Sequence, residues 1–160
     1  MLSRREVCMT GAMLVFGLTI ADPVWAQEPG EKGALRLAIK GYDPVAYFNE
    51  RRPVVGKEEF EYPWDEVRYR FASDRHMSTF RGDPDRYTPQ FAGSCAMGMS
   101  KGVKVEADPA NWLISDGRLF VFASPKARER FRADARGEAA AADSNWQLLQ
   151  DAPFGTSLAH

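Results

Sequence analysis

The sequence predicts a small single domain of the α+β class, made of two ββα-like units (hairpins with capped helices) plus a short C-terminal helix. Two observations predict this class. Aromatic and polar residues alternate over 60–64 and 67–71, and again on either side of Ser115-Asp116-Gly117, which is typical of half-buried hairpin strands. Each predicted hairpin then runs into a Phe-Ala-Ser segment, whose serine suits the N-cap of a helix.

The two predicted units repeat about fifty residues apart. Phe80 follows Phe71 by nine residues, and Phe131 follows Phe122 by the same nine, so each helix can place one ring against its own strands. We expect the first helix over 74–81 and the second from Ser124-Pro125 to about 135, since proline suits the first helical position. The final short helix is expected over 145–149.

The N-terminal residues indicate export. Residues 1–26 combine a basic start, an apolar run over 9–21 and a small-residue exit, the pattern of a secretory signal peptide. Arg4-Arg5 also fits a twin-arginine signal, and the two export routes stay open. We expect a flexible lead-in over 27–33, the domain over 34–150 and a loose tail over 151–160. The apolar run is shorter than the roughly 20 residues that span a bilayer, so we predict a periplasmic protein without a membrane span in its mature form.

The charge balance bears on partners. The formal net charge is −1, and the predicted signal carries two basic and two acidic residues, so its removal leaves this balance unchanged. A near-neutral chain argues against nucleic acid as the main partner.

Cys95 is the candidate reactive residue. The other cysteine, Cys8, lies in the predicted signal, so Cys95 is the one cysteine of the predicted mature chain. We expect Ser94 to cap a short helix whose first turn holds Cys95, where backbone amides stabilise a thiolate. Three interpretations stay open: a buried apolar side chain, a redox thiol, or a metal ligand.

Several stretches together resemble the YHS domain family, in particular an exported single-domain branch that includes selenoproteins. The resemblance covers most of 34–149 and rests on Gly41 to Phe48, Tyr69 to Ser73, Phe80 with Asp83-Pro84 and Tyr87, Pro89 to Gly93 with Cys95-Ala96, Asp116 to Phe120, and Asn145-Trp146. It implies an α+β fold and a metal-binding or redox module, although many members have no assigned activity. The family's better-known metal pattern has two cysteines where this chain has Ala72 and His76.

These observations give two hypotheses from different classes. In the first, Cys95, Met97, Met99 and His76 bind a soft metal, most readily copper, because thiolate and thioether sulfurs suit Cu(I), or Cys95 acts as a redox thiol. Core packing is the competing interpretation of both methionines. In the second, the domain is a non-catalytic interaction module whose aromatic faces bind a partner protein or a hydrophobic ligand. No catalytic constellation is evident, so we do not predict an enzyme.

Overall fold

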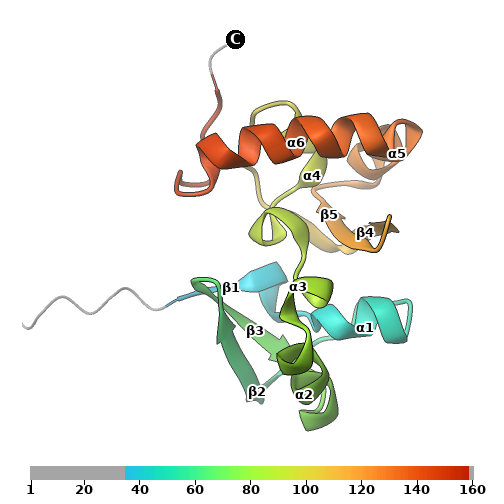
Figure 1. The fold of residues 1–160 in the computed structure, drawn as a ribbon, viewed down its shortest axis with the longest axis vertical. Helices are drawn as coiled ribbons and strands as arrows, with labels where there is room; N and C mark the ends of the chain where they lie inside the picture. The colour runs from blue at the N-terminus through green and yellow to red at the C-terminus, as the bar shows by residue number, and fades with distance from the viewer. Residues whose placement is uncertain (1–34, 159–160) are drawn as a thin grey trace, which may run out of the picture. The chain divides into compact units, whose positions relative to one another are not determined.

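The computed structural model describes residues 35–158 (Figure 1). The predicted signal peptide over 1–26 and the lead-in over 27–33 lie outside these residues. The described part is an α+β domain, as predicted. Its elements in chain order are β1 (Arg36–Leu37), η1 (Ala38–Gly41), α1 (Pro44–Asn49), β2 (Lys57–Trp64), β3 (Val67–Phe71), α2 (Asp74–Gly82), α3 (Pro84–Tyr87), η2 (Gln90–Gly93), α4 (Ala96–Ser100), β4 (Asp108–Ser115), β5 (Arg118–Phe122), α5 (Pro125–Ala133) and α6 (Ala135–Leu149).

Both predicted hairpins are present. β2 and β3 pair antiparallel up to Trp64 opposite Val67, and β1 adds to the same sheet in the order β1-β3-β2. β4 and β5 pair antiparallel up to Ser115 opposite Arg118. Each hairpin leads into a helix capped by the predicted serine, whose hydroxyl accepts a backbone N–H three residues on. Local pattern and capping therefore suffice to define these segments.

Each unit has its own group of packed aromatic rings within the shared core. In the first unit, the Phe80 ring lies 5.0 Å from Tyr69 and 5.1 Å from Phe71, between ring centroids. In the second, Phe131 lies 4.9 and 5.1 Å from the two phenylalanines of β5. All of these rings are almost completely buried. The nine-residue spacing in the sequence thus reports a shared packing arrangement.

The units are joined through α1 and β4. The Tyr47 hydroxyl donates to the Pro109 carbonyl at 2.9 Å, and its ring meets Trp112 edge-on at 5.3 Å. Tyr47 is fully buried. Because a buried hydroxyl without a partner is costly, this bond ties the position of β4 to that of α1.

Two left-handed turns, η1 and η2, were not predicted. Residues 39–41 and 91–93 all have positive φ, including 38° for Ile39 and 56° for Phe91. This conformation is unfavourable for residues with a Cβ, most of all for a β-branched one. The two turns also contact each other, so packing against the partner turn holds each of them in place.

The C-terminal part differs from the expectation. The final helix is α6, a fifteen-residue helix that begins at Ala135, rather than a short helix over 145–149. Asp134 caps it by accepting from the Gly137 N–H at 3.1 Å, and the alanine run that follows favours helix. The expected loose tail is hydrogen-bonded as far as it is described: Lys104 N–H donates to the Thr156 carbonyl at 2.9 Å, and Leu158 N–H to the Gly102 carbonyl at 2.8 Å.

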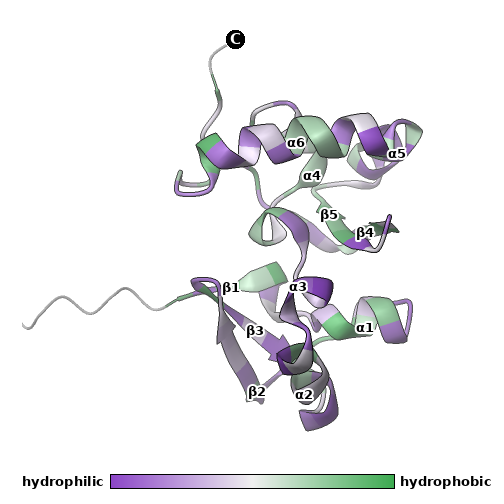
Figure 2. Cartoon of the chain, in the orientation of Figure 1, coloured by the Kyte–Doolittle hydropathy of each residue, from purple (hydrophilic) through white to green (hydrophobic). Residues whose placement is uncertain are grey.

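The hydropathy of the elements follows their packing. α4 is coloured largely hydrophobic and the outer strand β2 largely hydrophilic (Figure 2). This agrees with the burial of four of the five α4 residues and the mainly exposed or half-buried residues of β2. Over 35–158, no helix has the length and apolar character needed to cross a membrane.

The contact between the left-handed turns can be tested with two glycines of similar backbone conformation. A Cβ on Gly93 (φ 77°) would lie 2.8 Å from Cγ2 of Ile39, whereas one on Gly117 (φ 75°) would meet nothing within 4 Å. Gly117→Ala should therefore cost only left-handed strain, about 1 kcal/mol, and Gly93→Ala about 1–3 kcal/mol more through overpacking. Urea unfolding of both variants measures the difference, and equal losses would contradict the close approach.

Candidate functional site

Cys95 itself caps α4, in place of the expected Ser94. Its Sγ accepts the Gly98 N–H at 3.4 Å, and its backbone N–H donates to the Val105 carbonyl at 2.9 Å. The residue is only 2% exposed. Ser94 is buried as well, and its hydroxyl oxygen has no hydrogen-bond partner. The Cys95 thiol therefore caps α4, a role that the sequence predicted for the Ser94 hydroxyl.

The two methionines near Cys95 belong to the hydrophobic core. Met97 is 9% exposed and Met99 is fully buried. The Met99 carbonyl accepts from the Asn145 side-chain amide at 2.9 Å, which anchors α4 to α6. Cys95 is the extended N-cap residue of α4, and Met99 lies within that helix, four residues further on. Both residues are part of the buried core.

Asp43 forms the most extensively hydrogen-bonded polar site in the first unit. Its carboxylate is fully buried and caps α1, accepting from Val45 N–H at 2.9 Å and Ala46 N–H at 3.3 Å. Its second oxygen accepts from Ala72 N–H at 2.9 Å and lies 2.6 Å from Nδ1 of His76. A buried carboxylate must be hydrogen-bonded to be tolerated, and here the strand-to-helix junction and the imidazole supply the donors.

His76 is consequently held in one orientation. Because the Asp43 carboxylate already accepts backbone donors, the short contact assigns a proton to Nδ1 and leaves Nε2 as the lone-pair nitrogen of the neutral ring. Nε2 lies 4.0 Å from Oε1 of Glu50, whose other oxygen pairs with Arg52 at 2.5 Å. The His76 side chain is 14% exposed. The sequence predicted His76 and Cys95 as ligands of one metal site. In the structure, the hydrogen-bond partner of His76 is Asp43, the cap of α1.

Asp43 and Cys95 occupy equivalent positions in the two units. Each residue follows a left-handed turn, caps the next short helix, and donates its backbone N–H to a carbonyl further along its own unit, at 2.8 and 2.9 Å. In the second unit, Ala127 occupies the helix position that His76 occupies in the first, three residues after the capping serine. In the second unit, Cys95 therefore corresponds to Asp43 and Ala127 corresponds to His76, so this unit has no imidazole beside its cap.

Sequence reasoning missed Asp43 and Glu50 as site residues. The signal for a cap was present, because Asp43-Pro44 is a typical helix start. The contact with His76 joins residues 33 positions apart, and no local pattern reveals it. Within residues 35–158, no three His, Cys, Asp or Glu side chains converge as a ready metal-binding group.

The comparisons with known proteins give no relative: no protein-family model, curated protein or solved structure matches the chain.

The equivalence of the two caps predicts unequal costs of truncation. Asp43→Ala removes a helix cap and leaves the Ala72 N–H and the His76 ring without their acceptor, so it should lower the free energy of unfolding by about 3 kcal/mol or more. Cys95→Ala removes one weak sulfur acceptor and little volume, and should cost about 1 kcal/mol. Denaturant unfolding of both variants provides the measurement. A larger loss for Cys95→Ala would overturn the assignment of Asp43 as the main polar tie.

Proposed function

We propose that this protein binds copper through His76 and works in the periplasm as a metal-binding protein without catalytic activity of its own. The observation that carries the proposal is the 2.6 Å contact between His76 Nδ1 and the buried Asp43 carboxylate. Histidines that bind metals usually donate their second ring N–H to a carboxylate or carbonyl, which fixes the ring and raises its basicity. Asp43 provides this support before any ion arrives.

The donor set around Nε2 fits a divalent copper ion. Imidazole nitrogen is a copper ligand, and divalent copper is the strongest binder in the first-row series. Glu50 supplies a second donor atom, Oε1, 4.0 Å from Nε2, which is near the upper limit for two ligand atoms each about 2.0–2.2 Å from one ion. With two protein ligands, water or a partner molecule would complete the coordination. We therefore expect reversible loading, which suits a carrier better than a permanent structural site.

The second candidate is a monovalent copper or thiol-redox site at Cys95. It is favoured by the burial of Cys95 and Met99 within one short segment, since sulfur donors suit Cu(I). Met97 lies on the same short helix. The same burial limits the access of a redox partner to Sγ, which is why we place His76 first.

The interaction-module hypothesis has less support. The aromatic rings that suggested a binding face pack largely into or against the hydrophobic core. Among the large apolar side chains of residues 35–158, those exposed are Leu35, Val55 and Leu148, far apart in the sequence. Partner binding through a broad apolar face is therefore not the function that we propose.

Copper titration separates the candidates. With Cu(II), we expect one site per chain whose electron paramagnetic resonance spectrum shows nitrogen coordination. His76→Ala, which reproduces the Ala127 arrangement of the second unit, should abolish the nitrogen signal, and Asp43→Asn should weaken binding by about 10–100-fold. Cys95→Ala should leave Cu(II) affinity unchanged. His160→Ala is the matched control for the other histidine of the chain.

The same variants define the contradicting results. Unchanged Cu(II) binding by a folded His76→Ala variant would overturn the proposal. Cu(I) binding that is lost in Cys95→Ala and retained in His76→Ala would transfer the site to α4, and Met97→Leu and Met99→Leu would then show which thioether takes part. Circular dichroism on every variant distinguishes lost binding from lost fold.

A further inference from the structure

A short turn after α1 carries the charged groups that lie next to His76. Glu50 is the C-cap of α1, Arg51 follows in the left-handed conformation with φ 56°, and Arg52 comes next. Oε1 of Glu50 lies 4.0 Å from Nε2 of His76, whereas Oε2 of Glu50 lies 2.5 Å from the Arg52 guanidinium. The two oxygens of this carboxylate therefore have different partners.

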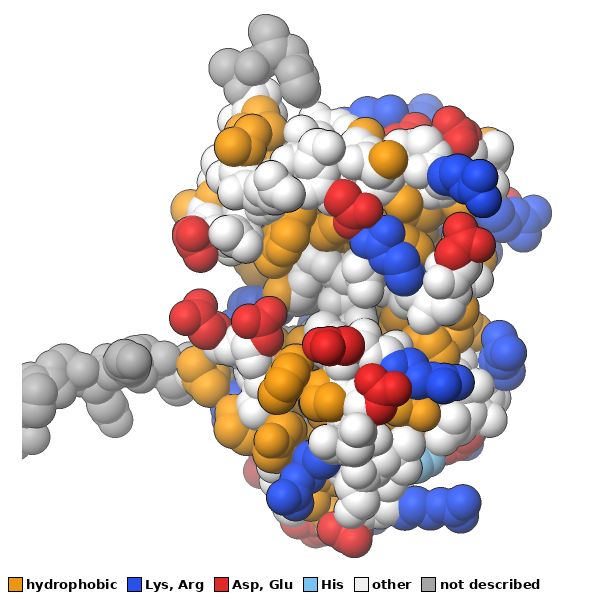
Figure 3. Space-filling view, viewed as in Figure 1, with side chains coloured by type: hydrophobic (Ala, Val, Ile, Leu, Met, Phe, Trp, Pro, Cys, Tyr) orange, Lys and Arg blue, Asp and Glu red, His pale blue; other side chains and the backbone are white. Residues whose placement is uncertain are grey.

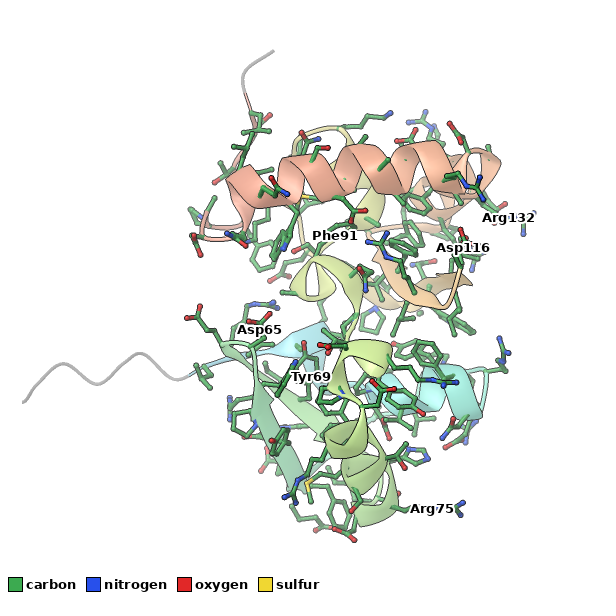
Figure 4. The ribbon with its side chains drawn as sticks, viewed as in Figure 1. Asp65, Tyr69, Arg75, Phe91, Asp116 and Arg132 are labelled. Carbon is green, nitrogen blue, oxygen red and sulfur yellow. The ribbon has the colours of Figure 1, made fainter. Side chains whose placement is uncertain are left out.

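The turn lies at the protein surface. The side chains of Arg52 and Glu50 are 64% and 32% exposed, and that of His76 is 14% exposed. In the space-filling view, the histidine colour is visible near the lower right, close to acidic and basic side chains (Figure 3). Arg75, which precedes His76 on α2, extends away from the protein (Figure 4). The imidazole is thus partly open to solvent, with the Glu50–Arg52 pair beside it.

The second unit has the same turn with different side chains. α4 ends at its C-cap, Lys101, and Gly102 follows with φ 71°, in the left-handed conformation that Arg51 adopts in the first unit. The next residue, Val103, is therefore the counterpart of Arg52. At these positions the second unit has no glutamate–arginine pair, so the pair is specific to the first unit.

The pair between Arg52 and Glu50 adds little to the stability of the fold. Ion pairs between exposed side chains contribute little or nothing measurable to the free energy of unfolding, and Arg52 is mostly exposed. The pair has a larger effect on the carboxylate itself. Because the guanidinium binds Oε2, rotation of the carboxylate is restricted, and Oε1 remains the oxygen that lies next to Nε2 of His76.

We propose that Arg52 is a positioning residue for the copper site, an inference that rests on the proposed function. Asp43 holds His76 through Nδ1, and Arg52 holds Glu50 through Oε2. Each ligand therefore has one atom bound to a supporting side chain and one atom, Nε2 or Oε1, that binds the ion. Loss of such a supporting contact typically lowers metal affinity by about 10–100-fold.

The charge of Arg52 makes the direction of the effect informative. A guanidinium next to the site repels a divalent cation, so removal of its charge alone would strengthen copper binding. Loss of the contact that positions Glu50 would weaken it. Weaker binding by a folded Arg52→Gln variant therefore reports lost positioning.

Cu(II) titration of the full chain tests this role. Arg52→Gln should bind Cu(II) about tenfold more weakly than the wild type, with the nitrogen signal of His76 retained in the electron paramagnetic resonance spectrum and an unchanged midpoint of urea unfolding. Arg52→Lys should recover part of the loss, because an ammonium also donates to Oε2. Arg75→Gln is the matched control, since it removes a cation adjacent to His76 that does not pair with Glu50, and it should change the affinity by less than about twofold because exposed charges are screened.

A double-mutant cycle shows whether Arg52 acts through Glu50. In a Glu50→Ala background, Arg52→Gln should cause no further loss of Cu(II) affinity. An equal loss in both backgrounds, or unchanged or tighter binding by Arg52→Gln alone, would overturn the proposal while leaving copper binding by His76 intact. A wild-type chain that binds no Cu(II), or a His76→Ala variant that binds it as the wild type does, would overturn the proposed function and this inference with it.

Discussion

The buried carboxylate of Asp43 is the interaction on which the rest of the first unit depends. Removing a carboxylate from water is expensive, and the cost is offset only where donors surround it. Asp43 gathers backbone N–H groups from the start of α1 and from the β3–α2 junction, together with the His76 ring. One side chain therefore fixes the direction of two helices and the orientation of the imidazole. Any function of His76 follows from this arrangement.

The two units share one packing arrangement but differ in several of the side chains that form it. Rings at equivalent positions hold each hairpin against its helix, and a residue after each left-handed turn caps the next short helix. The first unit has a polar side chain at three positions where the second unit has a less polar one. Asp43 corresponds to Cys95, His76 to Ala127, and Tyr69 to Phe120. The second unit has the same arrangement of elements without these polar groups, so they are specific to the first unit. The proposed copper ligand His76 lies at such a difference.

The sequence predicted what local chemistry controls. The hairpins, the serine caps and the repeated phenylalanine spacing were all visible in short segments, and the structure has them. The left-handed turns were not, because Ile39 and Phe91 adopt an unfavourable backbone conformation that only tertiary contacts can hold. The partner of His76 was also out of reach, since it depends on groups brought together from distant segments. Cys95 was read as part of a soft-ligand cluster with His76, yet that ring is bonded to the cap of the other unit.

The central claim is that Asp43 holds His76 with its proton on Nδ1 and its lone pair on Nε2. Nitrogen-15 NMR of the imidazole, recorded on the full chain where the ring is neutral, tests it directly, with His160→Ala to assign the signals. The account predicts a single Nδ1–H tautomer that becomes a mixture in Asp43→Ala. An Nε2–H tautomer in the wild type, or a mixture that Asp43→Ala leaves unchanged, would contradict it.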